Sequence, residues 1–101
     1  MRIGTVEISS KLALAPMAGV TDAAFRQICS ELGAGYTITE LISSKALCYH
    51  DKKTFSLLTQ FSGEHPAAVQ IFGSDPVCMA EAAQIAIAET GADILDINMG
   101  C

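Results

Sequence analysis

The sequence lacks the features that mark membrane and exported proteins. None of its apolar runs approaches the roughly 20 residues that an α-helix needs to span a bilayer, although half of its 101 residues are hydrophobic. It opens with Met1-Arg2-Ile3-Gly4, without the charged and then apolar stretches of a secretory signal. We therefore expect a folded, cytoplasmic protein without a membrane partner, and not a disordered tail.

Histidines and closely spaced cysteines are also scarce. The four cysteines, Cys29, Cys48, Cys78 and Cys101, form no CxxC motif, and only two histidines are present. This spacing gives no zinc site, so we expect no metal. Because disulfides are rare in cytosolic proteins, we interpret Cys29 and Cys78 as small apolar residues on helices.

Positive charge is scarce too. Six Lys and Arg residues stand against eleven Asp and Glu residues, which gives a net charge of −5. Nucleic acids are held largely by Lys and Arg against phosphate. We therefore expect this segment alone not to grip a nucleic acid, and any main basic surface to lie elsewhere.

What the sequence does contain is four short apolar runs, over residues 12–15, 35–39, 67–72 and 94–98. The first and third are almost continuously apolar, which is typical of parallel strands covered on both faces. Residues 3–8 alternate between apolar and polar. With Ser9-Ser10 as a turn, they predict a short hairpin with the first run.

Helical patterns separate these runs. Residues 22–32 place Phe25, Ile28, Cys29 and Leu32 on one apolar stripe, as in a helix that turns this face to a core. A second helix begins at Ser74-Asp75-Pro76, a capping residue followed by a first-turn proline, and ends at Gly91. Residues 43–62 are polar and mixed, and we expect a short helix or two and a long loop there.

The resulting order is βαβαβαβ. The runs start near positions 12, 35, 67 and 94, which are 23, 32 and 27 residues apart, close to the roughly 30 residues per unit of a (β/α)8 barrel. A doubly wound sheet alternates similarly, but no GxGxxG follows any run. We predict the N-terminal half of a TIM barrel, and, because four strands would leave two open edges, a truncated sequence.

Barrel enzymes carry their reactive groups at the carboxyl ends of the strands. After the first run, Pro16 and Gly19 flank a loop that either approaches a flat ligand or is an ordinary turn. Glu40 ends the second run, as a pocket carboxylate or as an acid at a helix start. Gln70 lies within the third run, where burying its amide without partners would cost ~2–7 kcal/mol. Its amide would bond either the polar edge of a flavin or a neighbouring strand.

The last run ends in Asp96-Ile97-Asn98-Met99-Gly100-Cys101. Cys101 can act there as a nucleophile or a general acid, although most cysteines are buried apolar thiols. Gly100 indicates a turn that would present the thiol. Asp96 shares a strand face with Asn98, and it either orients its neighbours or forms a salt bridge.

The residues with the most characteristic order and spacing are Leu14–Asp22, Phe25-Arg26, Gly33–Gly35, Thr39-Glu40, Val69–Pro76 and Asp96–Cys101. Together they resemble the tRNA-dihydrouridine synthase family, and its bacterial B-type branch most. The resemblance covers almost the whole chain. Each motif is weak alone, but the first and last together are highly specific. Leu41 departs from the pattern, because many members have methionine there.

The resemblance implies a TIM barrel that binds FMN, followed by a small helical domain that helps to grip tRNA. Residues 1–101 would then be part of the FMN-binding barrel domain, without its C-terminal half and without the helical domain. It also implies that NADPH reduces the flavin and that hydride passes to the uracil of a flipped-out uridine. A cysteine supplies the proton, and the product is 5,6-dihydrouridine in tRNA.

By position, the resemblance assigns Cys101 as the proton donor. It implies that the flavin is lined by Pro16, Met17 and Ala18 and hydrogen-bonded by Gln70, and that Asn98 contacts the uracil or the flavin edge. The family's later lysine, histidine and phosphate site fall beyond Cys101. We therefore expect the isolated chain to have no synthase activity and to bind FMN poorly.

Two other functions fit the same pattern. One is another FMN-dependent TIM-barrel oxidoreductase that acts on a small molecule such as an orotate or an enone. The other is a non-catalytic binding or regulatory barrel, or an inert fragment of one. The Gly100-Cys101 ending and the motif over residues 15–22 favour the synthase.

Overall fold

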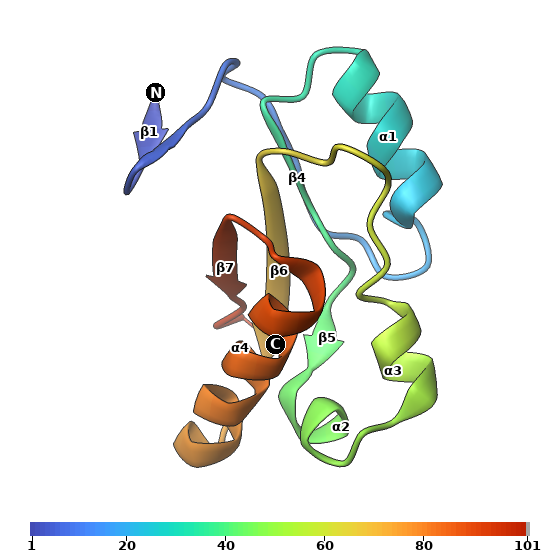
Figure 1. Ribbon diagram of the computed structural model, residues 1–101, viewed down its shortest axis with the longest axis vertical. Coiled ribbons are helices and arrows are strands. Elements are labelled where there is room, and N and C mark those ends of the chain that lie inside the picture. The colour runs from blue at the N-terminus through green and yellow to red at the C-terminus, as the bar shows by residue number, and fades with distance from the viewer. Residues whose placement is uncertain (101) are drawn as a thin grey trace.

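The computed structural model describes residues 1–100 and has an α/β architecture (Figure 1). The predicted alternation of strands and helices is confirmed. In chain order the elements are β1 (Arg2–Ile3), β2 (Val6–Glu7), β3 (Ala13–Leu14), α1 (Ala23–Glu31), β4 (Tyr36–Ile38), β5 (Ile42–Ser43), α2 (Ser44–Cys48), α3 (Lys52–Ser56), β6 (Ala67–Phe72), α4 (Pro76–Thr90) and β7 (Ile94–Ile97).

The main sheet is parallel throughout. β3 pairs with β4, both β4 and β5 pair with β6, and β7 pairs with β6. Figure 1 shows β6 standing between β4 and β7, with the carboxyl ends of the strands in the lower part of the view. Neighbours in the sheet therefore follow the order of the chain, as the predicted half-barrel requires.

The second predicted strand, residues 35–39, is β4, and a bulge separates it from β5. Ile38 lies opposite Ala68, whereas Ile42 lies opposite Ile71. Four steps along one strand therefore match three along its neighbour, which is the signature of a β-bulge. β4 ends one residue before the predicted end at Thr39, and pairing with β6 resumes in β5 beyond the extra residue.

The core lies between β6 and the helices that cover one side of the sheet. β6 is buried over almost its whole length, as its apolar run predicted. Val69 and Ile71 are fully buried in one cluster with Ala82 and Ala86 of α4. The small alanine side chains allow the helix to lie close to the strand.

The ends of α4 lie where capping residues predicted them. The Asp75 side chain accepts hydrogen bonds from the backbone N–H groups of Val77 and Cys78, at 2.9 and 3.1 Å. Pro76 occupies the first turn, where its missing N–H costs nothing. Gly91 closes the helix with φ 64°, a left-handed conformation that glycine adopts without strain.

Two strand predictions near the N-terminus were wrong. Residues 3–8 do not form one strand against residues 12–15; instead Arg2 pairs with Glu7 and Ile3 with Val6 in a hairpin of their own. The chain reverses at Gly4, whose φ is 59°. In addition β3 is not covered on both faces by residues 1–100, because Ala13 is exposed.

The apolar stripe of α1 is not turned to the core. Phe25, Ile28 and Leu32 are 37%, 54% and 83% exposed, whereas Arg26 on the same helix is only 1% exposed. The expected inward face was wrong because the Arg26 guanidinium turns inward to the Glu64 carboxylate and to the backbone carbonyls of Thr21 and Thr59.

The mixed segment over residues 43–62 holds α2 and α3, in agreement with the short helices expected there. Their starts are capped by the side chains of Ser43 and Asp51. Within residues 1–100, no helix combines the length and apolar character that crossing a bilayer requires.

Candidate active site at the carboxyl ends of the strands

The loop after β3 is fixed by its own hydrogen bonds. The fully buried Thr21 hydroxyl accepts from the Met17 N–H at 3.0 Å and donates to the Met17 carbonyl at 3.2 Å. Gly19 has φ 75°, which closes the turn. Met17 and Ala18 are exposed on this turn and Pro16 is half-buried. The three residues predicted to line a flavin therefore present a preformed surface.

Glu40 connects this loop to the neighbouring strand. It lies in the bulge between β4 and β5, and its Oε1 accepts a hydrogen bond from the Gly19 N–H at 2.5 Å. Bulges often redirect side chains near active sites. Glu40 also lines a hollow of about 240 Å³ between the start of α1 and the end of α3, and its interpretation as a carboxylate of the ligand pocket stays a prediction.

The Thr39 side chain supplies a hydrogen-bond acceptor to β6 where the bulge interrupts the backbone pairing. Its hydroxyl accepts a hydrogen bond from the Gln70 N–H at 3.1 Å and donates to the Glu40 carbonyl at 3.0 Å. Without this hydroxyl, the buried Gln70 N–H would lose its partner, at a cost of ~1–3 kcal/mol. The side chain of Thr39 thus fixes both the strand that carries Gln70 and the residue that holds the loop.

Gln70 is the centre of a polar cluster on adjacent strands. Its side chain is buried, and its Nε2 donates to Asp96 Oδ2 at 2.5 Å. Asn98 Nδ2 lies 3.4 Å from Gln70 Oε1, and Asn98 Oδ1 accepts from the Gly100 N–H at 2.9 Å. Asp96 therefore orients the Gln70 amide. Among residues 1–100, no salt bridge to Asp96 is found. The interpretation of Gln70 as part of a network between strands is confirmed.

The sheet brings these predicted residues to one edge in two groups. Gln70 and Asn98 are joined through hydrogen bonds on β6 and after β7. Pro16, Met17 and Ala18 belong to the loop after β3, on the other side of β4. Cys101, the predicted proton donor, lies outside the described residues.

Comparison with known proteins shows the family to which this chain belongs. The family model described as Dihydrouridine synthase (Dus) matches residues 13–101. The chain belongs to the dihydrouridine synthase family. Its 101 residues are 46% identical to tRNA-dihydrouridine synthase B of Pseudomonas aeruginosa, 48% to that of Pasteurella multocida and 46% to that of Escherichia coli K12. The whole chain aligns in each case, and it spans 30–31% of the length of these relatives.

The predicted family and fold class are therefore confirmed. Dihydrouridine synthases are TIM-barrel proteins, and the consecutive parallel strands β3, β4 and β5, β6 and β7 form the N-terminal part of such a barrel. The carboxyl edge that carries Gln70 and Asn98 is the edge where barrel enzymes place their chemistry.

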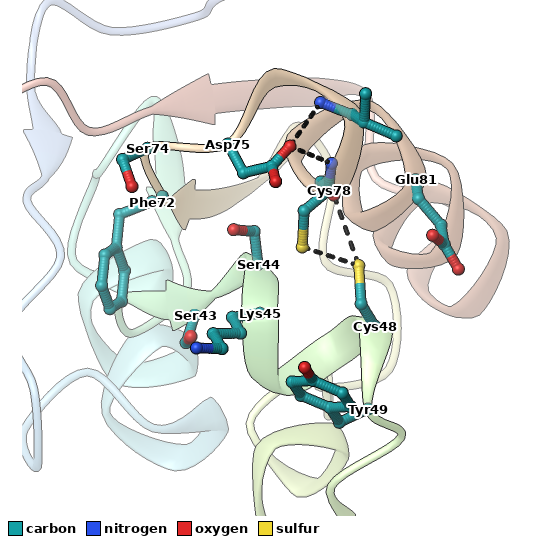
Figure 2. A pocket seen from close by; sticks show the side chains of 12 residues that line it. Ser43, Ser44, Lys45, Cys48, Tyr49, Phe72, Ser74, Asp75, Cys78 and Glu81 are labelled. Atoms are coloured by element: carbon teal, nitrogen blue, oxygen red, sulfur yellow. Dashed lines mark hydrogen bonds between the residues drawn. The ribbon is translucent and has the colours of Figure 1, made fainter.

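A larger pocket lies beside that edge. It measures about 560 Å³ and opens between α2, the end of β6 and the first turn of α4 (Figure 2). None of the predicted flavin or substrate residues lines it. The strand-end cluster carries the stronger chemical signal, because the buried Gln70 amide meets the half-buried Asp96 carboxylate there, whereas the pocket wall is largely exposed.

The sequence interpretation missed one pair of residues in this pocket. Cys48 ends α2 and Cys78 lies in the first turn of α4, and their Sγ atoms are 2.9 Å apart. The hydrogen bond with the Cys78 side chain, partial burial and the negative charge of Glu81 raise the pKa of Cys48 to about 12. No spacing motif signals this pair, because 30 residues separate the two cysteines. Within residues 1–100, no group of three or more His, Cys, Asp or Glu is placed to hold a metal ion.

A second missed feature is a buried ion pair that anchors α1. Arg26 Nε lies 2.7 Å from Glu64 Oε1, and both side chains are almost fully buried. The guanidinium also donates to the carbonyls of Thr21 and Thr59, at 2.7 Å each. Arg26 thereby joins the end of the strand-end loop to the segment that precedes β6. The available signal was the single basic residue of α1, at the border of its apolar stripe.

Proposed function

We propose that the protein to which this chain belongs reduces specific uridines of tRNA to 5,6-dihydrouridine, with FMN as its resident cofactor and NADPH as the reductant. Family membership and the names of the relatives support this proposal. The structural observation that supports this proposal most directly is the hydrogen-bonded cluster of Gln70, Asp96 and Asn98 at the carboxyl edge of the sheet.

The residues at this edge fit a flavin. A carboxamide offers two N–H donors and two acceptor lone pairs, and Asp96 and Asn98 use one of each on Gln70. One donor and one acceptor remain for the polar edge of an isoalloxazine ring. Met17 and Ala18, exposed on the rigid loop after β3, would pack against the ring beside Pro16. FMN would supply the hydride that uracil C6 receives.

The bonds around Gln70 give it one orientation. The Asp96 carboxylate holds the Nε2 end of the amide, so the Oε1 end faces Asn98. A fixed amide orders the donors and acceptors before the ligand arrives, which lowers the entropic cost of binding. Asp96 is therefore assigned a positioning role and Gln70 a contact role.

Asn98 would hold the uracil or the flavin edge, and Cys101 would donate the proton to uracil C5. Asn98 Oδ1 accepts a hydrogen bond from the N–H of Gly100, the residue directly before that cysteine. This bond fixes the path of the chain leading to Cys101. A general acid has to reach the reacting atom within about 2.6–3.2 Å, so the approach of the chain matters for catalysis.

The binding of tRNA would depend on residues outside this chain. The net charge of −5 is unsuited to a phosphate backbone. The target uridine would have to leave its stack to reach the edge of the sheet. We place this reaction in the cytoplasm, where tRNA and NADPH are available.

The test is position-resolved mass spectrometry of tRNA from a strain that lacks the full-length gene. We expect dihydrouridine to disappear from a subset of positions and to return with the wild-type gene. The Cys101→Ala variant should fail to restore it, whereas Cys29→Ala, altered at a half-buried residue of α1, should succeed. Unchanged dihydrouridine in the deletion strain would overturn the proposal and favour a small-molecule oxidoreductase.

A further inference from the structure

Two thiols from distant parts of the chain meet at the wall of the 560 Å³ pocket. Cys48 Sγ and Cys78 Sγ lie 2.9 Å apart, and Cys48 Sγ lies 3.4 Å from the Cys78 carbonyl oxygen. Figure 2 shows the two side chains pointing toward each other across the gap between α2 and α4. Both residues are only half-buried, so a small reagent can reach them.

The backbone around the thiols is held in place by close packing. Gly73 follows β6, and a Cβ added there would overlap Ser44 Oγ at the start of α2. The absence of a side chain thus lets α2 lie directly against the strand end that leads into α4. The Asp75 carboxylate fixes the first turn of α4 through the Cys78 N–H. The two sulfurs are therefore brought together by the fold and not by flexible loops.

We propose that Cys48 and Cys78 form a reversible disulfide by exchange with a small-molecule disulfide, and so make up a redox site beside the carboxyl edge of the sheet. A disulfide bond is about 2.05 Å long, so the sulfurs need to approach by less than ~1 Å. Disulfides in cytosolic proteins are usually transient and redox-sensing. A preformed thiol pair on the surface suits that use.

The exchange has two balanced steps. Cys78 loses its proton and its thiolate attacks one sulfur of a disulfide RSSR. The S–S bond of RSSR breaks, one RS⁻ leaves, and Cys78 becomes a mixed disulfide. Cys48 then loses its proton and attacks Cys78 Sγ, which releases the second thiolate. The two protein protons end on two RSH molecules, so the protein loses two electrons and RSSR gains them.

The order of the steps follows from the environment of Cys48. Its raised pKa, about 12, keeps it protonated, so it is poorly suited to attack first. Cys78 should therefore be the residue that first reacts with the oxidant, and Cys48 the residue that resolves the intermediate.

The disulfide would join the end of α2 to the start of α4 across the mouth of the pocket. Neither sulfur belongs to the strand-end cluster around Gln70. The oxidation therefore does not depend on the proposed synthase reaction, and the two can fail separately.

The test is incubation of the full-length protein with oxidised glutathione, followed by acid quenching, alkylation and peptide mapping. In the folded protein we expect at least ~tenfold more Cys48–Cys78 linkage than any linkage of Cys29, because the fold raises the effective concentration of one thiol at the other. In urea the preference should reverse. Cys29 and Cys48 are only 19 residues apart, and shorter loops close more readily.

Single variants test whether each sulfur resolves an adduct on the other. In Cys48→Ser and in Cys78→Ser the remaining thiol of the pair should accumulate as a stable mixed disulfide with glutathione, because no second thiol is present to resolve it. Cys29→Ser is the matched control and should leave the Cys48–Cys78 linkage unchanged. Glutathione adducts without a cross-link, or the same linkage pattern in the folded protein and in urea, would overturn the proposal.

Discussion

The buried ion pair of α1 allows a quantitative test of the structure. Glu64 accepts hydrogen bonds from Arg26 Nε at 2.7 Å, from Arg26 Nη2 at 3.3 Å and from the Thr37 hydroxyl at 2.6 Å. Glu64→Gln keeps the shape of the side chain but leaves the guanidinium without a counter-charge. Removing one partner of a buried pair costs about 3–5 kcal/mol. We expect the lower end, about 3 kcal/mol, because Arg26 retains two backbone carbonyl acceptors.

Urea unfolding followed by far-UV circular dichroism measures this loss. With a slope of ~1.5 kcal/mol per molar urea, about 3 kcal/mol lowers the midpoint by roughly 2 M. The matched control is Glu7→Gln. Glu7 lies 3.8 Å from Arg2 with both side chains more than half exposed, so its loss should change stability by less than ~1 kcal/mol. If the free energies of unfolding of Glu64→Gln and Glu7→Gln differ by less than ~1 kcal/mol, the assignment of Arg26 as a buried anchor is refuted.

Four further outcomes are expected. Gln70→Ala should weaken FMN binding to the full-length protein about tenfold, since it removes a hydrogen bond worth ~1–1.5 kcal/mol; fluorescence titration measures this, and unchanged affinity would exclude Gln70 from the flavin site. Glu40→Ala should speed hydrogen exchange at the Gly19 N–H, while Glu40→Gln, which keeps an acceptor, should do so much less; equal rates in the two variants would contradict the role of the carboxylate. The hydrogen bond from the Ala67 N–H is the main cause that holds the pKa of Asp93 below its ordinary 3.8. The Asp93 carboxylate therefore stabilises the fold above pH ~4, and this stability is lost as the pH falls through the lowered pKa of Asp93. In that acidic range, the urea midpoint of the Asp93→Asn variant should depend less on pH than the midpoint of the wild type. Finally, the isolated 101-residue chain should bind little FMN and form no dihydrouridine in tRNA; a near-stoichiometric flavin spectrum would contradict this.

The features that were predicted from the sequence are those encoded locally. Apolar runs of four to six residues gave the parallel strands, and the Asp75-Pro76 start and Gly91 end gave the bounds of α4. Each of these depends on neighbours within a turn or two of the chain. The family resemblance supplied roles for residues whose own chemistry left two interpretations open.

The features that were missed depend on contacts between distant residues. The inward side of α1 is set by Glu64, which follows Arg26 by 38 residues, so helical periodicity alone favoured the wrong face. The partner of Gln70 is decided by the register of β6 against β7, which places Asp96 opposite it. The alternation of side chains along a strand gives the side on which a residue lies, but it does not give the residue opposite it on the neighbouring strand.

The bulge between β4 and β5 also determines on which side of the sheet the residues after it lie relative to those before it. Ile38 and Ile42 are both even-numbered and would share a side in an uninterrupted strand. The register instead places Ile38 beside Ala68 and Ile42 beside Ile71, on opposite sides of the sheet. The extra residue thus inverts the parity of the strand, and Ile42 lies in the core beneath α4. Deleting any one residue between 39 and 41 would leave a plain ladder with Ile42 still beside Ile71. The extra residue therefore is not needed to place Ile42 in the core, and what it adds is the outward loop that carries Glu40 to the Gly19 N–H.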